Sequence, residues 1–146
     1  MINWLHQEEG FCEGCFESKV FHDEDGDELS IAMQSPDLSE CAEKCVAAFQ
    51  NLTESNINEI CKGIINCAKE GGIDNDFELP ELENAIDILN YCWFTTLYVN
   101  MLNKDDEIAY VVEGEGEWGD DIGFAIENNK IIYVGTDYFD YMKDRK

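Results

Sequence analysis

Basic residues are scarce in this sequence. Lys and Arg together number 9 against 33 Asp and Glu, so the formal net charge is -24 at pH 7 and the pI is near 4.1. A surface with this charge repels phosphate backbones and anionic headgroups, which excludes nucleic-acid binding through the usual basic patches. The charge instead favours cations, metal ions or basic proteins as partners.

Long apolar runs are also missing. The longest apolar region, 91–102, is interrupted by Thr95, Thr96 and Asn100, and it falls short of the ~20 residues of a membrane span. Residues 1–9 lack the basic and apolar regions of a signal peptide, so we expect a cytoplasmic protein. The 7 cysteines agree with this expectation, because an odd count cannot pair completely and cytosolic thiols stay reduced.

The apolar pattern predicts a single domain over residues 1–146. Hydrophobic residues make up 45% of the 146 residues, which is enough for one core. We expect an N-terminal hairpin within 14–33, built from a strand over 14–22, an acidic turn over 23–28 and a strand carrying Leu29, Ile31 and Met33.

The remaining pattern predicts a helical middle over 37–90 and a C-terminal sheet over 94–136. The first helix opens near Pro36, the second starts near Thr53 and is stopped by Gly71-Gly72, and a short helix covers 81–89. The expected strands are 94–102, 108–118, 122–127 and 130–135, the last two joined by a turn at Asn128-Asn129. This order predicts an α+β fold with an antiparallel sheet packed against two to three helices.

Acidic residues alternate with glycine in the C-terminal sheet. Glu113, Glu115 and Glu117 are spaced by two, so a strand would place all three carboxylates on one face. Like charges on one face cost stability. The row, with Trp118 and Asp120-Asp121 after it, therefore suggests a docking surface for a cationic protein, the alternative being a solvated edge strand.

A second acidic surface is predicted at the N-terminal turn, at Asp23, Asp25, Asp27 and Glu28. Residues 7–28 and residues 103–127 each contain nine acids and one base, a net charge of -8 apiece. Such fields accelerate the association of basic proteins. Trp118, Tyr110 and Trp93 are candidate aromatic anchors, a role common at interfaces.

The cysteines leave a metal site open as an alternative. Cys12 and Cys15 form a CxxC motif that could hold zinc if two further ligands were near, and Cys41 and Cys45 could supply them from one helix face. Buried cysteine is also an ordinary core residue. We therefore predict no metal and no cofactor, with Cys12 and Cys15 as the weak candidates. Paired carboxylates can perform acid–base catalysis, but no histidine lies near the acidic row, and we expect no enzyme.

The C-terminal third resembles a known family pattern. The segments are Ile108–Trp118, Gly119–Phe124 and Asn129–Thr136, in which a Trp-containing strand passes through an acidic turn into a Gly-Phe strand and then a hairpin ending in Val-Gly. This pattern resembles small bacterial domains of unknown function of the DUF6985 and DUF2004 type. The resemblance covers roughly 91–136, and the upstream hairpin and helices match in order.

Such a resemblance implies a role in toxin–immunity loci, including contact-dependent growth inhibition. It implies no catalytic residue. With the charge, it leads to the hypothesis of a non-enzymatic immunity protein that occludes the cationic active site of a cognate basic toxin such as a nuclease. The expected partner-binding residues are Glu113, Glu115, Glu117, Trp118, Asp120, Asp121, Asp23, Asp25, Asp27 and Glu28.

Overall fold

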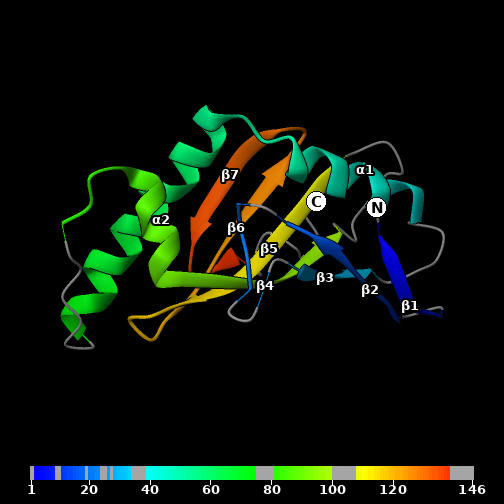
Figure 1. Cartoon of the computed structure of the whole chain (residues 1–146), viewed down its shortest axis with the longest axis horizontal. Helices are drawn as coiled ribbons and strands as arrows, with labels where there is room; N and C mark the ends of the chain where they lie inside the picture. Colours follow the sequence, from blue (N-terminus) through cyan, green and yellow to red (C-terminus); the bar gives the residue numbers. More distant parts are fainter. Residues whose placement is uncertain are drawn as a thin grey trace.

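The computed structural model describes residues 2–8, 11–18, 20–23, 26, 28–33, 39–74, 81–99 and 108–138. In this part of the chain seven strands form one sheet whose order follows the sequence (Figure 1). The strands are β1 (Asn3–Glu8), β2 (Phe11–Glu17), β3 (Glu28–Met33), β4 (Cys92–Val99), β5 (Ala109–Gly116), β6 (Asp121–Glu127) and β7 (Lys130–Gly135). All neighbours are antiparallel except β3 and β4, which are parallel.

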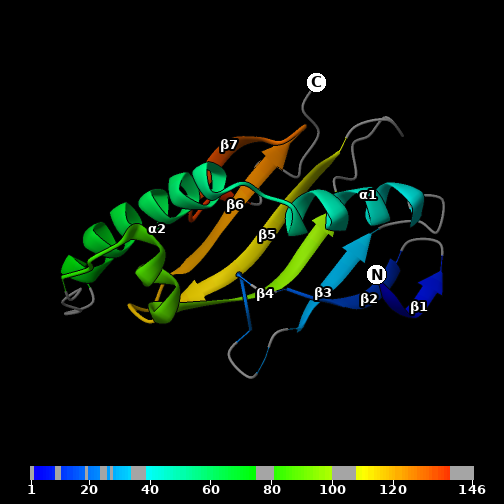
Figure 2. The same cartoon turned by 45° about the horizontal axis from the view of Figure 1, so that its top comes forward.

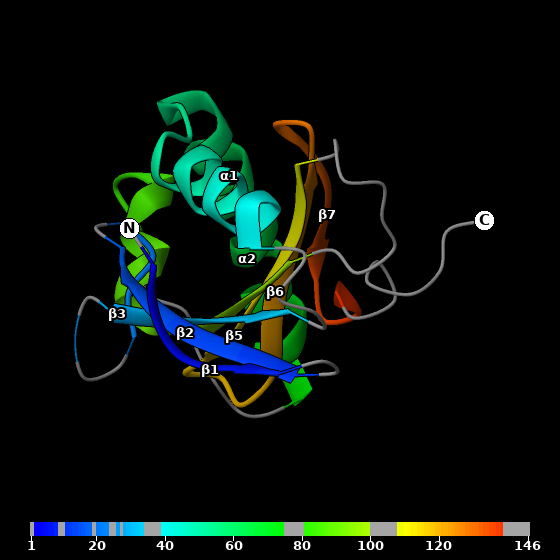
Figure 3. The same cartoon turned by 90° about the vertical axis from the view of Figure 1, so that its right-hand side faces the viewer.

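Within the described segments, three helices pack on one side of this sheet. They are α1 (Ser39–Gln50), α2 (Glu54–Asp74) and the 3-10 helix η2 (Ala85–Tyr91). Figure 3 shows the sheet curling around α1 and α2, so that one face is concave and covered, while none of the three described helices lies on the outer face. The predicted α+β class is therefore confirmed. The apolar face that the residue spacing predicts for α1 is confirmed, because Cys41, Cys45 and Phe49 are buried toward the sheet.

The N-terminal hairpin has the predicted faces but different limits. Leu29, Ile31 and Met33 of β3 are buried, as period-two alternation requires. The expected strand over 14–22 is wrong at its end, because β2 stops at Glu17 and the connection turns toward β4, where the Phe94 N–H donates to the His22 carbonyl at 2.9 Å. Strand β1 was not predicted, since its mostly exposed side chains give no alternating pattern.

Phe21 lies in the connection between β2 and β3, yet it is 2% exposed. Its ring centre is 5.5 Å from Phe49 of α1, 5.2 Å from Phe94 of β4 and 5.1 Å from Phe124 of β6. Aromatic pairs at such distances add stability beyond their buried area. The main core is therefore a cluster that joins the N-terminal hairpin, the helices and the C-terminal strands, and a second, smaller cluster of Val111, Ala125 and Tyr138 lies on the other face of the sheet.

The C-terminal meander follows the prediction closely. Asn128 and Asn129 have φ values of 50° and 66°, the left-handed conformation that a two-residue hairpin turn requires and that asparagine tolerates. The expected strand over 108–118 was too long, because β5 ends at Gly116 and residues 117–118 form a turn. The end of the expected strand 94–102, beyond Val99, lies outside the described residues.

Helix α2 does not stop at Gly71-Gly72, as the sequence suggested, but continues to Asp74. The structure gives Gly71 a packing role instead of a terminating one. A β-carbon at this position would collide with the Asp120 carboxylate and lie 2.9 Å from Trp118 Cδ1. Gly71 thus allows the β5–β6 turn to approach the helix closely.

Gly71→Ala should destabilise the protein by about 1–3 kcal/mol, although alanine is the better helix former. The added methyl group would force the Asp120 and Trp118 side chains away from α2. Urea unfolding monitored by circular dichroism measures the change. Asn58→Ala, at an exposed position of the same helix, is the control and should be neutral or slightly stabilising. An unfolding free energy of Gly71→Ala at or above wild type would contradict this packing role.

Candidate binding surface

The strand directions bring the two predicted acidic segments to the same end of the sheet. Since β3 and β4 are parallel and the other pairs antiparallel, β2 and β5 end where β3, β4 and β6 begin. The β2–β3 connection and the β5–β6 turn therefore lie along one edge of the molecule, the lower edge in Figure 2. The sequence treated these segments as two candidate surfaces, and the topology places them at the same end of one sheet, with the start of β4 between them.

Directly opposed carboxylates mark this end of the sheet. Glu17 faces Glu28 at the end of the β2–β3 pair, and Glu115 faces Asp121 at the end of the β5–β6 pair. All four residues are exposed. Like charges at facing positions destabilise a sheet. We call these four residues, Glu17, Glu28, Glu115 and Asp121, the acidic sheet end.

The acidic sheet end belongs to the outer face of the sheet. Phe16, Leu29 and Ile122, each next in sequence to one of its members, are buried in the core on the helix side. Since neighbouring residues of a strand point to opposite faces, the carboxylates point away from the helices. This arrangement leaves them accessible to a large partner.

Glu113 lies on the same outer face but has internal partners. The Tyr98 hydroxyl donates to its Oε1 at 3.0 Å, and the Tyr138 hydroxyl donates to its Oε2 at 3.3 Å. Burial, together with the Glu113 charge, raises the pKa of Tyr98 to about 12. Burial and the same carboxylate also raise the pKa of Tyr138. Glu113 therefore organises two tyrosines on the outer face, whereas the sequence had suggested a free docking carboxylate.

Glu117 and Trp118 differ from their predicted roles. Glu117 is exposed but lies in the turn beyond β5, so the expectation that three glutamates share one strand face holds for Glu113 and Glu115 and is wrong for Glu117. Trp118 is 2% exposed and packs near Gly71, so it cannot act as a surface anchor. Its burial follows from the β5–β6 turn folding onto α2.

Trp93 is the aromatic candidate that the outer face retains. It is partly exposed and pairs with Glu115 across the β4–β5 ladder. Tyr110, the other candidate anchor, is 1% exposed and its ring packs edge-on to Phe49 in the core. The sequence alone could not tell that Trp93 faces outward and Tyr110 faces the core. Residue alternation assigns side chains to the two faces only when the strand register is known.

Asp120 and Asp121 also line an open groove between α2 and the end of β7. The groove has a volume of about 800 Å³, and its described lining carries four carboxylates but no Lys or Arg: Gly63, Asn66, Cys67, Glu70, Gly71, Asp120, Asp121, Tyr133, Val134, Gly135, Thr136 and Asp137. It adds negative charge beside the acidic sheet end.

The N-terminal acidic turn is only partly described. Asp23 is half-buried and forms an isolated bridge with Gly26, as a tight turn requires. Glu28 is exposed and belongs to the acidic sheet end. The predicted binding residues Asp25 and Asp27 lie outside the described residues.

The side chains of Cys12 and Cys15, the weak candidates for a metal site, point in opposite directions. Cys12 is fully buried on the core face of β2, and Cys15, three residues later, lies on the outer face. Odd spacing on a strand always separates two side chains in this way. The two thiols therefore cannot hold one ion. Cys41 and Cys45 are buried under α1, and within the described segments no three His, Cys, Asp or Glu residues are arranged to hold a metal.

The fold and this surface define a small α+β domain with one helix-covered and one acidic sheet face. The chain matches the family model of DUF6985, a domain of unknown function, over residues 1–141, and it belongs to that family. No curated protein and no solved structure matches it. In the described part of the chain, no helix combines the length and apolarity that crossing a membrane requires.

Glu115→Lys should stabilise the isolated protein, because it replaces the repulsion with Asp121 by an attraction. We expect the melting temperature to rise by about 1–3 °C at low ionic strength and the gain to shrink at 1 M salt. Thermal unfolding at the two salt concentrations measures this. Glu115→Gln removes only the repulsion and should fall between wild type and Glu115→Lys. A Glu115→Lys melting temperature below wild type at low salt would contradict the destabilising contact.

The tyrosine cluster predicts a loss of stability in alkaline solution. Tyr98 in the unfolded chain ionises near its ordinary pKa of about 10, and the folded protein holds the proton up to about pH 12. The stabilisation is complete below pH 10 and is lost between pH 10 and 12. Tyr98→Phe should therefore flatten the fall of the unfolding free energy across this range, as measured by urea unfolding. Tyr91→Phe is the matched control, and equal slopes for both variants would refute the assignment.

Proposed function

We propose that this protein is a non-enzymatic immunity protein that acts in the bacterial cytoplasm and neutralises a cognate basic toxin. The target would be a nuclease, whose active-site cleft must be cationic to hold a phosphate backbone. The acidic sheet end would enter that cleft, and its carboxylates would take the positions of substrate phosphates. No residue of the immunity protein performs chemistry in this mechanism.

The observation that carries this proposal is the pair of opposed carboxylates at one end of the sheet. Glu17 with Glu28 and Glu115 with Asp121 cost the isolated protein stability, since each pair repels across a strand. A cationic partner would convert both repulsions into attractions. Sites that cost stability in the free protein are commonly functional.

The surrounding charge supports the same mechanism. A net charge of -24 steers a basic protein toward this molecule before contact. The exposed carboxylate of Glu117 and the groove lined by Glu70, Asp120 and Asp137 extend the negative surface past the two opposed pairs. Trp93, between β5 and the N-terminal strands, would supply an apolar contact within the charged surface.

A charge-reversal comparison tests the proposal. Tagged wild type, the double variant Glu115→Lys with Asp121→Lys, and the control Glu43→Lys with Glu59→Lys are used to capture proteins from host lysate at low salt and at 0.5 M salt. The control makes the same charge change at exposed positions of α1 and α2. We expect one basic protein with wild type and control, weakened by salt, and at least a tenfold lower recovery with the double variant.

Growth assays then separate an inhibitor from an incidental partner. The captured protein is expressed in a bacterial host with each variant. Wild type and the control should restore growth, and the double variant should fail although it folds normally by circular dichroism. Equal capture and equal protection by the double variant would show that the acidic sheet end is not the interface. A captured protein without toxicity would refute the immunity role.

A further inference from the structure

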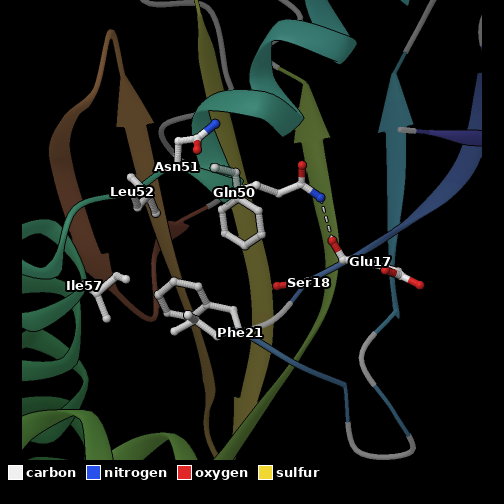
Figure 4. Close-up of a pocket in the computed structure, with 9 residues that line it drawn as sticks. Glu17, Ser18, Phe21, Gln50, Asn51, Leu52 and Ile57 are labelled. Carbon is white, nitrogen blue, oxygen red and sulfur yellow. Dashed lines mark hydrogen bonds between the residues drawn. The ribbon is translucent and has the colours of Figure 1, made fainter.

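A separate pocket opens on the helix side of the sheet, away from the acidic outer face. It has a volume of about 350 Å³ and lies between the end of β2, the β2–β3 connection, the end of α1 and the start of α2 (Figure 4). Its lining residues are Glu17, Ser18, Val20, Phe21, Phe49, Gln50, Asn51, Leu52 and Ile57. This volume falls at the lower end of the range of small-molecule sites.

The walls of the pocket suit a flat apolar group. The Phe21 and Phe49 rings, 5.5 Å apart and tilted by 30°, form one side, and the aliphatic side chains of Val20, Leu52 and Ile57 complete the enclosure. A cavity of about 150 Å³ lined by such residues already binds benzene. The pocket therefore has room for a substituted ring.

One polar side chain of a buried residue points into the pocket beside its apolar wall. Ser18 is 3% exposed and is the buried polar residue of the described core, and its hydroxyl is directed toward the pocket (Figure 4). Ser18 Oγ is not one of the fully buried, unpaired side-chain atoms of the described residues, which are Tyr110 Oη and Trp118 Nε1, so we take it to be accessible from the pocket. A ligand in the pocket that hydrogen-bonds to this hydroxyl gains affinity over one that cannot.

The rim is already organised. The Gln50 side-chain amide donates to the Glu17 carbonyl at 2.7 Å, and the Asn51 amide donates to the Ala47 carbonyl at 2.7 Å. These bonds fix the two side chains through their nitrogen atoms, so the amide oxygens remain as acceptors. With the strongly negative charge of the chain, these acceptors disfavour an anionic ligand.

We infer that this pocket binds an uncharged aromatic ring that carries one hydrogen-bonding hydroxyl, that is, a phenol. The ring would lie against Phe21 and Phe49, and its hydroxyl would bond to Ser18. A phenol reaches the site either as a free small molecule or as a tyrosine side chain of a peptide. Glu17 of the acidic sheet end borders this pocket, but the proposed ligand contacts are with Ser18, Phe21 and Phe49, so this inference does not rest on the proposed immunity function.

Binding of p-cresol, followed by the methyl NMR signals of Val20, Leu52 and Ile57, tests this inference. We expect saturable shifts with a Kd of about 0.1–1 mM, while Val111, in the separate apolar cluster of the outer face, stays unchanged. Toluene, which lacks the hydroxyl, and 4-methylbenzoate, which is an anion, should each bind at least fivefold more weakly. N-acetyl-tyrosinamide distinguishes the sources: affinity equal to that of p-cresol indicates a peptide tyrosine, and weaker affinity indicates a free phenol.

Two variants examine the geometry. Ser18→Ala should weaken p-cresol binding about fivefold and leave toluene binding unchanged. Leu52→Trp should fill the pocket and abolish binding, with Leu5→Trp, at an exposed position of β1, as the matched control. If Leu52→Trp does not fold, the effect of Ser18→Ala on p-cresol binding still tests the inference. No saturable shift at 5 mM p-cresol, or equal affinities of p-cresol and toluene for the wild type, would overturn the inference.

Discussion

The structure depends on one aromatic side chain in a connection. The two halves of the sheet meet at the β3–β4 pair, whose ladder spans only Ser30 to Ala32 opposite Thr96 to Tyr98. Beyond that short ladder, Phe21 packs against Phe49, Phe94 and Phe124, and the His22 carbonyl accepts the Phe94 N–H. The hydrophobic energy of this cluster therefore holds the N-terminal hairpin to the C-terminal meander where few sheet hydrogen bonds do so.

The parallel junction also decides where charge accumulates. An antiparallel β3–β4 pair would place the β2–β3 connection and the β5–β6 turn at opposite ends of the sheet. The parallel pair places them at the same end, where Glu17 faces Glu28 and Glu115 faces Asp121. The cost of those repulsions is small beside the burial energy of a continuous core, so the fold tolerates them.

The two faces of the molecule have different chemistry. The outer face carries exposed carboxylates and suits a large basic surface that is attracted from a distance. The helix side holds a partly open pocket with two aromatic rings in its wall and the Ser18 hydroxyl, which suits a small neutral ring. The acidic surface and the pocket meet at the start of the β2–β3 connection. There Glu17 points outward, and the next residue, Ser18, points into the pocket.

The sequence by itself determined the local features. Alternation located β3 and the C-terminal strands, apolar spacing located α1, and the Asn128-Asn129 pair located its turn, because these signals arise from backbone geometry within a few residues. Tertiary structure alone decided the packing of Gly71 and Trp118, the hydrogen-bond partners of Glu113 and the opposite orientations of Cys12 and Cys15. Each depends on a neighbour distant in sequence or on strand register, which composition and spacing do not encode.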